Sequence, residues 1–246
     1  VITLIYHKSL DSNWLTAARE LANSLSISIV GRCRGKRFVV GKEYVTEYFS
    51  IAERKFSYRQ YEQTFTQPNY QINQEMLTWV DQKTAKSEGD LIELYCGNGN
   101  FTLPMSQNFD RVIATEVSKR SARAAKENIV QNNISNINVV RMSARETAEA
   151  LEKKRTFRRL STLPVNLAEF KFSTLLVDPP RSGLDVDSIR LASSFDQVVY
   201  FSCSLDSFKS DIKTLSKTHE GRHFAIFDQF PTTKHVEIGT VLSKTI

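Results

Sequence analysis

Short apolar runs alternate with amphipathic stretches along most of the chain, and this alternation predicts its architecture. Strands that alternate with helices favour a doubly wound α/β sheet, whose ligands lie beyond the carboxyl ends of the strands. The predicted strands are 90–96, 111–117, 137–142, 173–177, 197–203 and 222–228, and the predicted helices are 100–107, 118–132, 143–155, 185–193 and 204–217. A last strand at 236–243 follows a turn at Pro231 and is expected to pair as an antiparallel hairpin.

The first 60 residues predict a smaller α/β segment. Its expected elements are strands at 2–6, 27–30, 37–40 and 44–50, a helix at 11–25, and turns at Gly31, Gly35 and Gly41. Residues 56–69 are rich in aromatic and amide side chains and precede a helix that starts at Pro68 and Asn69. Such side chains suit stacking on a base and bonding to its edge, and a β-hairpin explains them equally well. We therefore expect an N-terminal segment at 1–60 and a catalytic domain at 61–246.

A glycine turn follows the strand predicted at 90–96. Gly97 and Gly99 let the backbone pass close to a ligand, and Glu116 ends the next strand, where a carboxylate can accept both hydroxyls of a ribose. Asn100 and Phe101 follow the second glycine, so the third glycine of a dinucleotide-binding loop is absent. The shorter loop suits a cofactor without a pyrophosphate, and S-adenosyl-L-methionine is the commonest of these. The alternative is an ordinary strand-to-helix turn.

The composition is that of a folded protein. A chain of 246 residues that is 41% hydrophobic can bury the core of one large α/β domain with some appended structure. No apolar run approaches the roughly 20 residues of a membrane span, and no signal-peptide pattern opens the chain. We expect a soluble, cytoplasmic monomer, and Val1 in place of an initiator methionine indicates a fragment or a processed chain. The three cysteines lack metal-ligand spacing, which predicts reduced thiols and no metal site.

Positive charge is unevenly distributed along the chain. The formal charge is +6, and residues 1–60 carry ten Lys and Arg against five Asp and Glu, which leaves +1 for the rest. Such an excess favours a polyanionic partner such as RNA. The densest positive spot is the turn predicted at 31–37, which is either a phosphate contact or a solvated hairpin tip. The run KKRTFRR at 153–159 predicts a basic loop, either a second RNA contact or a solvated insertion.

Three groups with reactive chemistry lie at the ends of predicted strands and are expected to converge beside Gly97. The segment that begins with Asp178 and two prolines is similar to a motif of amino-group methyltransferases, but Arg181 replaces the aromatic residue of that motif. Arginine only donates hydrogen bonds, so it suits a uracil oxygen or a phosphate. The other two groups are Cys203 and Glu237.

Cys203 precedes a predicted helix, whose N-terminal N–H groups are expected to lower the pKa of the thiol. The alternative is a small buried apolar residue. Thiolate addition to C6 of a pyrimidine makes C5 nucleophilic, and the C5 proton must later be removed, for which Glu237 is a suitable base. Cys96 and His235 are interpreted as structural residues.

Six ordered motifs together resemble the tRNA (uracil-5-)-methyltransferase family: FTQPN (65–69), ELYCGNGNF (93–101), ATE (114–116), DPPRSGLD (178–185), SC (202–203) and DQFPTTKHVE (228–237). That family uses S-adenosyl-L-methionine to form 5-methyluridine in the T loop of tRNA, on a class I methyltransferase fold. The resemblance implies that Cys203 is the nucleophile and Glu237 the proton acceptor. It also implies that the cofactor and active-site set is Gln67, Tyr95, Asn100, Glu116 and Asp178. The glycine loop adds Gly97 and Gly99 to the cofactor set, and Phe65 and Arg181 are the candidate substrate-binding residues.

The chain departs from the family pattern in two places. Ser204 and Leu205 stand where the family has Asn-Pro. The family's chain is also longer at the N-terminus, so this chain resembles a protein that lacks its first, RNA-binding portion. Three alternatives stay open at this point: a uridine-C5 methyltransferase acting on 23S ribosomal RNA, an amino-group methyltransferase, and an RNA-binding or RNA-folding protein whose methylation is lost or incidental.

Overall fold

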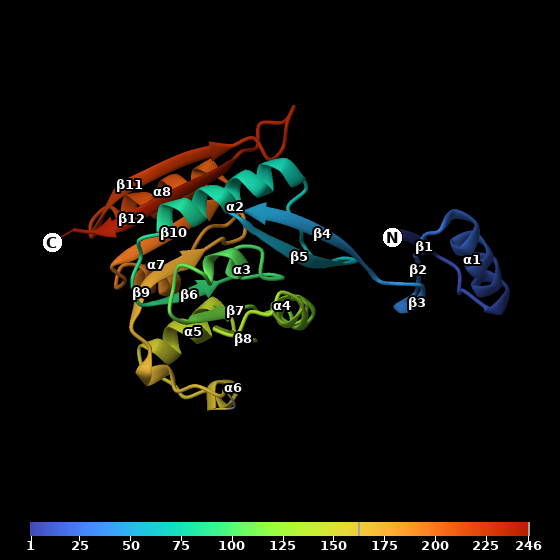
Figure 1. Cartoon of the computed structure of the whole chain (residues 1–246), viewed down its shortest axis with the longest axis horizontal. Helices are drawn as coiled ribbons and strands as arrows, with labels where there is room; N and C mark the ends of the chain where they lie inside the picture. Colours follow the sequence, from blue (N-terminus) through green and yellow to red (C-terminus); the bar gives the residue numbers. More distant parts are fainter. Residues whose placement is uncertain (162, 246) are drawn as a thin grey trace. The chain divides into compact units, whose positions relative to one another are not determined.

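Figure 1 shows the computed structural model, which describes residues 1–161 and 163–245. The chain divides into two compact units, the first made of Val1–Glu47 and Tyr58–Thr64 and the second of Tyr48–Ser57 and Phe65–Ile246. Strands β4 (Tyr44–Ile51) and β5 (Arg54–Tyr61) pair as a two-stranded hairpin that contributes residues to both units. The aromatic and amide-rich stretch therefore includes a strand, as its hairpin interpretation requires.

The first unit contains a three-stranded sheet. Strand β1 (Ile2–Tyr6) is parallel to β2 (Ile29–Cys33), which is antiparallel to β3 (Lys36–Val40). Helix α1 (Ser12–Leu25) connects β1 to β2, as a parallel crossover requires.

Two local features shape this small sheet. Asp11 caps α1, because its carboxylate accepts the Trp14 N–H at 2.9 Å. Gly31 lies inside β2, so its predicted place in a turn is wrong. It packs against the Trp14 ring, because a Cβ at this position would lie 2.2 Å from a ring atom. The turn that follows β2 contains Arg34 and Gly35, both at positive φ, as in a two-residue hairpin turn.

The second unit is organised around a seven-stranded sheet with the order β11-β12-β10-β9-β6-β7-β8. Its strands are β6 (Asp90–Leu94), β7 (Val112–Thr115), β8 (Ile137–Val140), β9 (Phe172–Val177), β10 (Gln197–Ser202), β11 (His219–Phe227) and β12 (Glu237–Lys244). Strand β12 is antiparallel to both of its neighbours, while β6 to β10 pair in parallel. The predicted doubly wound sheet with an antiparallel last strand is confirmed.

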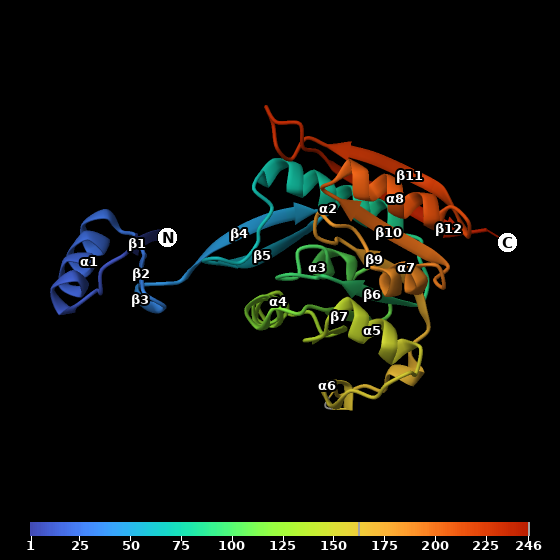
Figure 2. The ribbon, with the colours of Figure 1, turned by 180° about the vertical axis from the view of Figure 1, so that it is seen from behind.

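Helices cover both faces of this sheet (Figures 1 and 2). One face is covered by α2 (Tyr70–Thr84), α3 (Thr102–Met105) and α4 (Lys119–Gln131), and the other by α5 (Ala144–Leu151), α7 (Val186–Ala192) and α8 (Leu205–Leu215). Two short helices, α6 (Arg158–Ser161) and a 3-10 turn at Leu167–Glu169, lie in the connection from α5 to β9. The run at 153–159 is therefore not a loop throughout, because α6 begins at Arg158.

Buried side chains pack between the sheet and the helices on both of its faces. Ile92, Leu175 and Tyr200 belong to a buried cluster on the side of α5, α7 and α8. An aromatic group that includes Phe101 and Phe201, stacked at a centroid distance of 4.4 Å, lies under α2 and α3. In the described residues no helix is both long enough and apolar enough to cross a bilayer.

Candidate active site

The loop that follows β6 bends sharply through residues at positive φ. Tyr95, Gly97 and Gly99 have φ values of +61°, +57° and +89°. A Cβ on Gly99 would lie 2.6 Å from Leu103, whereas a Cβ on Gly97 would meet nothing within 4 Å. Gly99 therefore allows the loop to pack closely against Leu103. Gly97 leaves open space beside the backbone that suits a ligand.

Glu116 follows β7 and lies against this loop. One carboxylate oxygen accepts the Gly97 N–H at 3.1 Å, and the other accepts the Ser118 N–H at 2.7 Å. Both bonds fix the carboxylate, and each oxygen keeps a second lone pair with which it can accept a ribose hydroxyl. The structure thus brings Glu116 and Gly97 together, as the sequence interpretation requires.

Amide pairs hold two other residues of the predicted cofactor set. The Asn100 and Asn73 carboxamides exchange two hydrogen bonds of 2.9 and 3.0 Å. Gln67 is buried, and its Oε1 accepts a 2.8 Å bond from Nε2 of buried Gln229. That bond orients the Gln67 amide so that its Nε2 donor points away from Gln229. Gln229 lies in the motif at 228–237, but its contact with Gln67 was not predicted, because a contact across 162 positions leaves no local pattern.

Four side chains near the carboxyl ends of β9 and β10 interact electrostatically: Asp178, Arg181, Cys203 and Glu237. Burial and the charges of Glu237 and Asp178 raise the pKa of the Cys203 thiol, and Arg181 partly offsets that rise. Burial, followed by Asp178, raises the pKa of Glu237 to about 8, which Arg181 again opposes. Burial raises the pKa of Asp178 to about 7. These interactions agree with the expectation that the three segments converge, while their position beside Gly97 stays a prediction.

The expected lowering of the Cys203 pKa is wrong. Cys203 is half-buried and lies two residues before α8, whose N-terminal charge is a fraction of one unit. Loss of water and two nearby carboxylates outweigh that partial charge. Arg181 and a backbone hydrogen bond are the influences that favour the thiolate form.

Ser204 and Leu205 preserve the start of α8. Ser204 is the N-cap residue, and its hydroxyl accepts the Ser207 N–H at 3.4 Å. Asn and Ser cap helices almost equally well, so the replacement of Asn by Ser keeps the cap. Leu205 is half exposed at the first helical position, where proline is favoured but not required.

Glu93 is a further ionisable group that the sequence interpretation missed. It lies on β6 with 1% exposure, and its Oε2 atom has no hydrogen-bond partner. Burial, with smaller contributions from Asp178 and Glu116, raises its pKa to about 8. A charged residue inside the apolar run LIEL was the available signal, because a buried strand seldom carries one without a function.

The residues predicted to bind substrate are exposed. Phe65 is 70% exposed two residues before Gln67, and Arg181 is exposed after the two prolines of its loop. Tyr48, 64% exposed, also belongs to the second unit. Exposed aromatic rings suit stacking on an RNA base, and an exposed guanidinium suits a phosphate.

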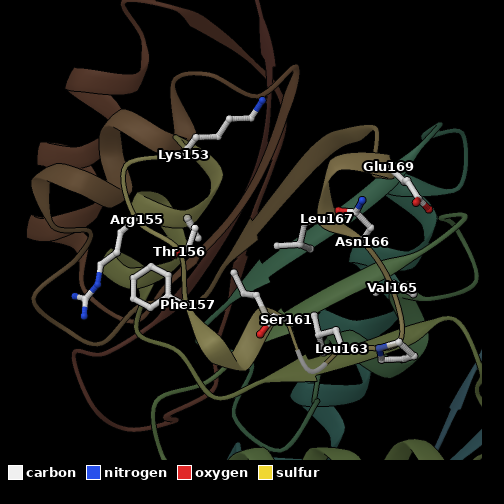
Figure 3. Close-up of a pocket in the computed structure, with 13 residues that line it drawn as sticks. Lys153, Arg155, Thr156, Phe157, Ser161, Leu163, Val165, Asn166, Leu167 and Glu169 are labelled. Carbon is white, nitrogen blue, oxygen red and sulfur yellow. The ribbon is translucent and has the colours of Figure 1, made fainter.

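A separate cavity of about 730 Å³ lies in the connection between α5 and β9 (Figure 3). Apolar side chains such as Leu167 line it, with Lys153 and Arg155 among its polar lining residues. The Arg155 guanidinium lies 4.9 Å from the centre of the Phe157 ring. Neither Cys203 nor Glu237 lines this cavity, so it is not the reaction site. The described residues also contain no group of three or more His, Cys, Asp and Glu side chains able to hold a metal.

Comparison with known proteins gives consistent matches. The family described as tRNA (Uracil-5-)-methyltransferase matches residues 1–245. A tRNA/tmRNA (uracil-C(5))-methyltransferase of Neisseria meningitidis is 48% identical over 246 residues, which are 100% of this chain and 67% of the relative. The enzyme of the same name from Acinetobacter baylyi is 48% identical over 98% of this chain and 67% of its own length.

Solved structures share the fold. The Pyrococcus abyssi tRNA (uracil-54, C5)-methyltransferase, in complex with S-adenosyl-L-homocysteine, superposes with a TM-score of 0.67 and 23% identity, over 87% of this chain and 50% of that chain. A putative S-adenosylmethionine-dependent methyltransferase from Streptococcus mutans gives a TM-score of 0.61 with 9% identity, over 98% of this chain and 68% of its own. The class I methyltransferase fold is thereby confirmed.

Proposed function

The chain belongs to the tRNA (uracil-5-)-methyltransferase family, and on this premise we propose that it methylates C5 of a uridine in the T loop of tRNA through a covalent cysteine adduct. The similar proteins from Neisseria and Acinetobacter are named for tRNA and tmRNA, so a T-loop-like part of tmRNA is a second substrate to test. The observation that carries the proposal is that Cys203, Asp178, Arg181 and Glu237 interact electrostatically at one edge of the sheet.

The residues around the glycine loop fit S-adenosyl-L-methionine. The open space beside Gly97 and the fixed Glu116 carboxylate suit the ribose side. The Gln67 Nε2, which is not the atom bonded to Gln229, is a suitable donor to the methionine carboxylate. The proposed cofactor set is Gln67, Tyr95, Gly97, Gly99, Asn100, Glu116 and Asp178. When bound, S-adenosyl-L-methionine supplies an electrophilic methyl group that a carbanion-like C5 can take up.

Cys203 is the proposed nucleophile. Its thiolate forms a bond to C6 of the uracil, and the π electrons of the C5–C6 bond move toward the C4 carbonyl oxygen, which gives an enolate. Arg181 is suited to stabilise that developing negative charge, since guanidinium is a permanent cation and donor. Phe65 is a suitable surface against which an unstacked base of the loop rests.

Glu237 is the proposed base for the last step. After methylation C5 carries both a methyl group and a proton. Glu237 takes that proton, the electrons re-form the C5–C6 double bond, and the bond from sulfur to C6 breaks to release the thiolate. A pKa of about 8 makes its carboxylate a stronger base than an exposed glutamate, while part of the population is ionised at neutral pH.

We further propose that residues 1–60 form part of an RNA-binding segment and residues 61–246 the catalytic domain. The charge of +5 on residues 1–60 supports the first assignment. Binding through phosphates should weaken steeply as salt concentration rises.

The experiment that tests this function uses labelled S-adenosyl-L-methionine with unmodified tRNA, followed by digestion and identification of the methylated nucleoside. We expect 5-methyluridine at one T-loop position, and no label with the Cys203→Ala variant. Parallel reactions with tmRNA and with 23S ribosomal RNA distinguish the substrates. A methyl group found on nitrogen would contradict the proposal and favour an amino-group methyltransferase.

A further inference from the structure

A buried carboxylate outside the reaction site connects the two segments that carry the reactive groups. Asp211, on α8, is 8% exposed. Its Oδ2 accepts a 2.7 Å hydrogen bond from the Tyr200 hydroxyl and a 2.9 Å bond from the Leu184 N–H. One oxygen atom thus joins β10, α8 and the loop that leads from β9 to α7.

Gly183 shows how closely this loop approaches α8. A Cβ at Gly183 would lie 2.6 Å from Asp211 Oδ2 and 2.9 Å from Ser207 Cβ, and its φ of +78° disfavours any other residue. The loop therefore lies directly on α8 at the position where the Asp211 carboxylate accepts the Leu184 N–H. Burial and the Asp211 carboxylate raise the pKa of Tyr200, so its hydroxyl stays protonated and donates.

The joined segments are those that carry the reaction chemistry. The loop holds Asp178 at its start and Arg181 in its middle, and α8 begins two residues after Cys203. We propose that Asp211 is a positioning residue that fixes the loop on α8 and so holds Arg181 beside the Cys203 thiol. This inference rests on the proposed roles of Cys203 and Arg181, and it adds a buried residue that accepts hydrogen bonds from Tyr200 and Leu184.

The effect on Cys203 follows from the charges around it. Burial, Glu237 and Asp178 raise the pKa of the thiol, while the charge of Arg181 and a backbone hydrogen bond lower it. If the loop separates from α8, Arg181 loses its fixed place and its contribution weakens. The thiol should then ionise at a higher pH, which is measurable without any methyl transfer.

The test is the pH profile of Cys203 alkylation by iodoacetamide, read by peptide mass spectrometry, in the wild-type protein, Asp211→Ala and Asp211→Asn. Cys33 and Cys96 are buried, and peptide mapping separates their signals. We expect Asp211→Ala to raise the midpoint by at least about 0.5 pH unit, or about threefold slower alkylation at fixed lower pH. Asn keeps one acceptor oxygen for both donors, so Asp211→Asn should stay within about 0.2 unit.

Asp90→Ala is the matched control. Asp90 is also a buried aspartate that accepts a backbone N–H, from Lys171 at 2.6 Å, but it begins β6 at the opposite edge of the sheet. The Asp90→Ala variant should lower stability without changing the pH midpoint of Cys203 alkylation. If Asp211→Ala does not fold, Gly183→Ala displaces the Asp211 carboxylate while keeping it in the chain, and the same upward shift is expected.

An unchanged midpoint in a folded Asp211→Ala or Gly183→Ala variant overturns the inference. So does an equal shift in Asp90→Ala, because general destabilisation would then explain the result. Wild-type methylation of RNA is measured separately. Absence of methylation by the wild type with a normal Asp211 effect contradicts the proposed function alone, whereas methylation without an Asp211 effect contradicts this inference alone.

Discussion

Asp90 and Glu93 lie three positions apart on β6, and their surroundings differ completely. Asp90, near the amino edge of the sheet, accepts bonds of 3.1 and 2.7 Å from Arg111 and of 2.6 Å from the Lys171 N–H. Glu93, near the carboxyl edge, has an Oε2 atom with no hydrogen-bond partner, and its pKa rises to about 8. Asp178 and Glu237, also at the carboxyl edge, have pKa values raised to about 7 and about 8.

The difference separates residues that stabilise the fold from residues available for chemistry. A buried carboxylate with a guanidinium and a backbone donor is fully compensated, so removing it leaves neighbours unsatisfied. A buried carboxyl without such partners costs stability in its charged form, and proteins concentrate such groups at functional sites. The amino edge should therefore govern stability, and the carboxyl edge should govern activity.

The largest expected effect is that of Cys203→Ala at the carboxyl edge. Without the thiol no adduct forms at C6, so methyl transfer should fall by at least about 10⁴-fold, the scale of nucleophile deletions. Binding of S-adenosyl-L-methionine, measured by calorimetry, should change less than about threefold. Rapid methylation by this variant would show that C5 is activated in another way.

The second effect is that of Glu237→Gln on turnover. Glutamine cannot accept the C5 proton, so turnover should fall by about 10²- to 10⁴-fold while the covalent RNA adduct accumulates. A denaturing gel that resolves the protein from its RNA adduct measures this directly. Cys203→Ala is the matched control and should give no adduct, and normal turnover by Glu237→Gln would place the base elsewhere.

The same substitution should change how stability depends on pH. The folded-state pKa of Glu237, about 8, lies above the ordinary value of 4.5, so the folded protein keeps a proton that the unfolded chain loses between these values. Its contribution to stability is complete below pH 4.5 and is lost as pH rises through 8. Glu237→Gln should therefore gain stability relative to the wild type from pH 5 to pH 9, by at most about 5 kcal/mol.

Urea unfolding at several pH values measures this difference. Titrating groups that do not interact with Glu237, such as Glu93, are present in both proteins and cancel in the comparison. A difference in unfolding free energy that stays constant with pH would mean that the Glu237 carboxyl ionises normally in the folded protein.

At the amino edge, Asp90→Ala should act on stability alone. It removes the acceptor of the Lys171 N–H and the partner of Arg111, so the free energy of unfolding should fall by about 2–4 kcal/mol. Methyl transfer by the folded variant should stay within about threefold of wild type. A loss of activity as large as that of Glu237→Gln would break the division between the two edges.

The periodicity of apolar residues and the local turn residues predicted the strands of the sheet and most of the residues at its carboxyl edge. The strand ends at Glu116 and Asp178 and the glycine loop follow from apolar runs and turn residues, which are local in sequence. Glu93 was visible as a charged residue inside an apolar run, but its raised pKa depends on burial and on Asp178 and Glu116, which lie far from it in the sequence. The direction of the Cys203 pKa was wrong, because the local helix effect was foreseeable while burial and the distant Glu237 were not. Asp211 and Gln229 act across folded distances and leave no pattern in the chain.

The smallest expected effect comes from substitution of Ser204, a residue that could influence both stability and activity. Ser204 caps α8 directly after the nucleophile, so Ser204→Ala should lower the free energy of unfolding by about 1 kcal/mol. Ser204→Asn should restore the cap and match the wild type, and activity should follow stability in both variants. Thermal unfolding together with methyl-transfer rates measures the two quantities. If Ser204→Ala loses activity far beyond its stability loss while Ser204→Asn does not, the cap sets the position of Cys203, and the first turn of α8 belongs to the catalytic machinery.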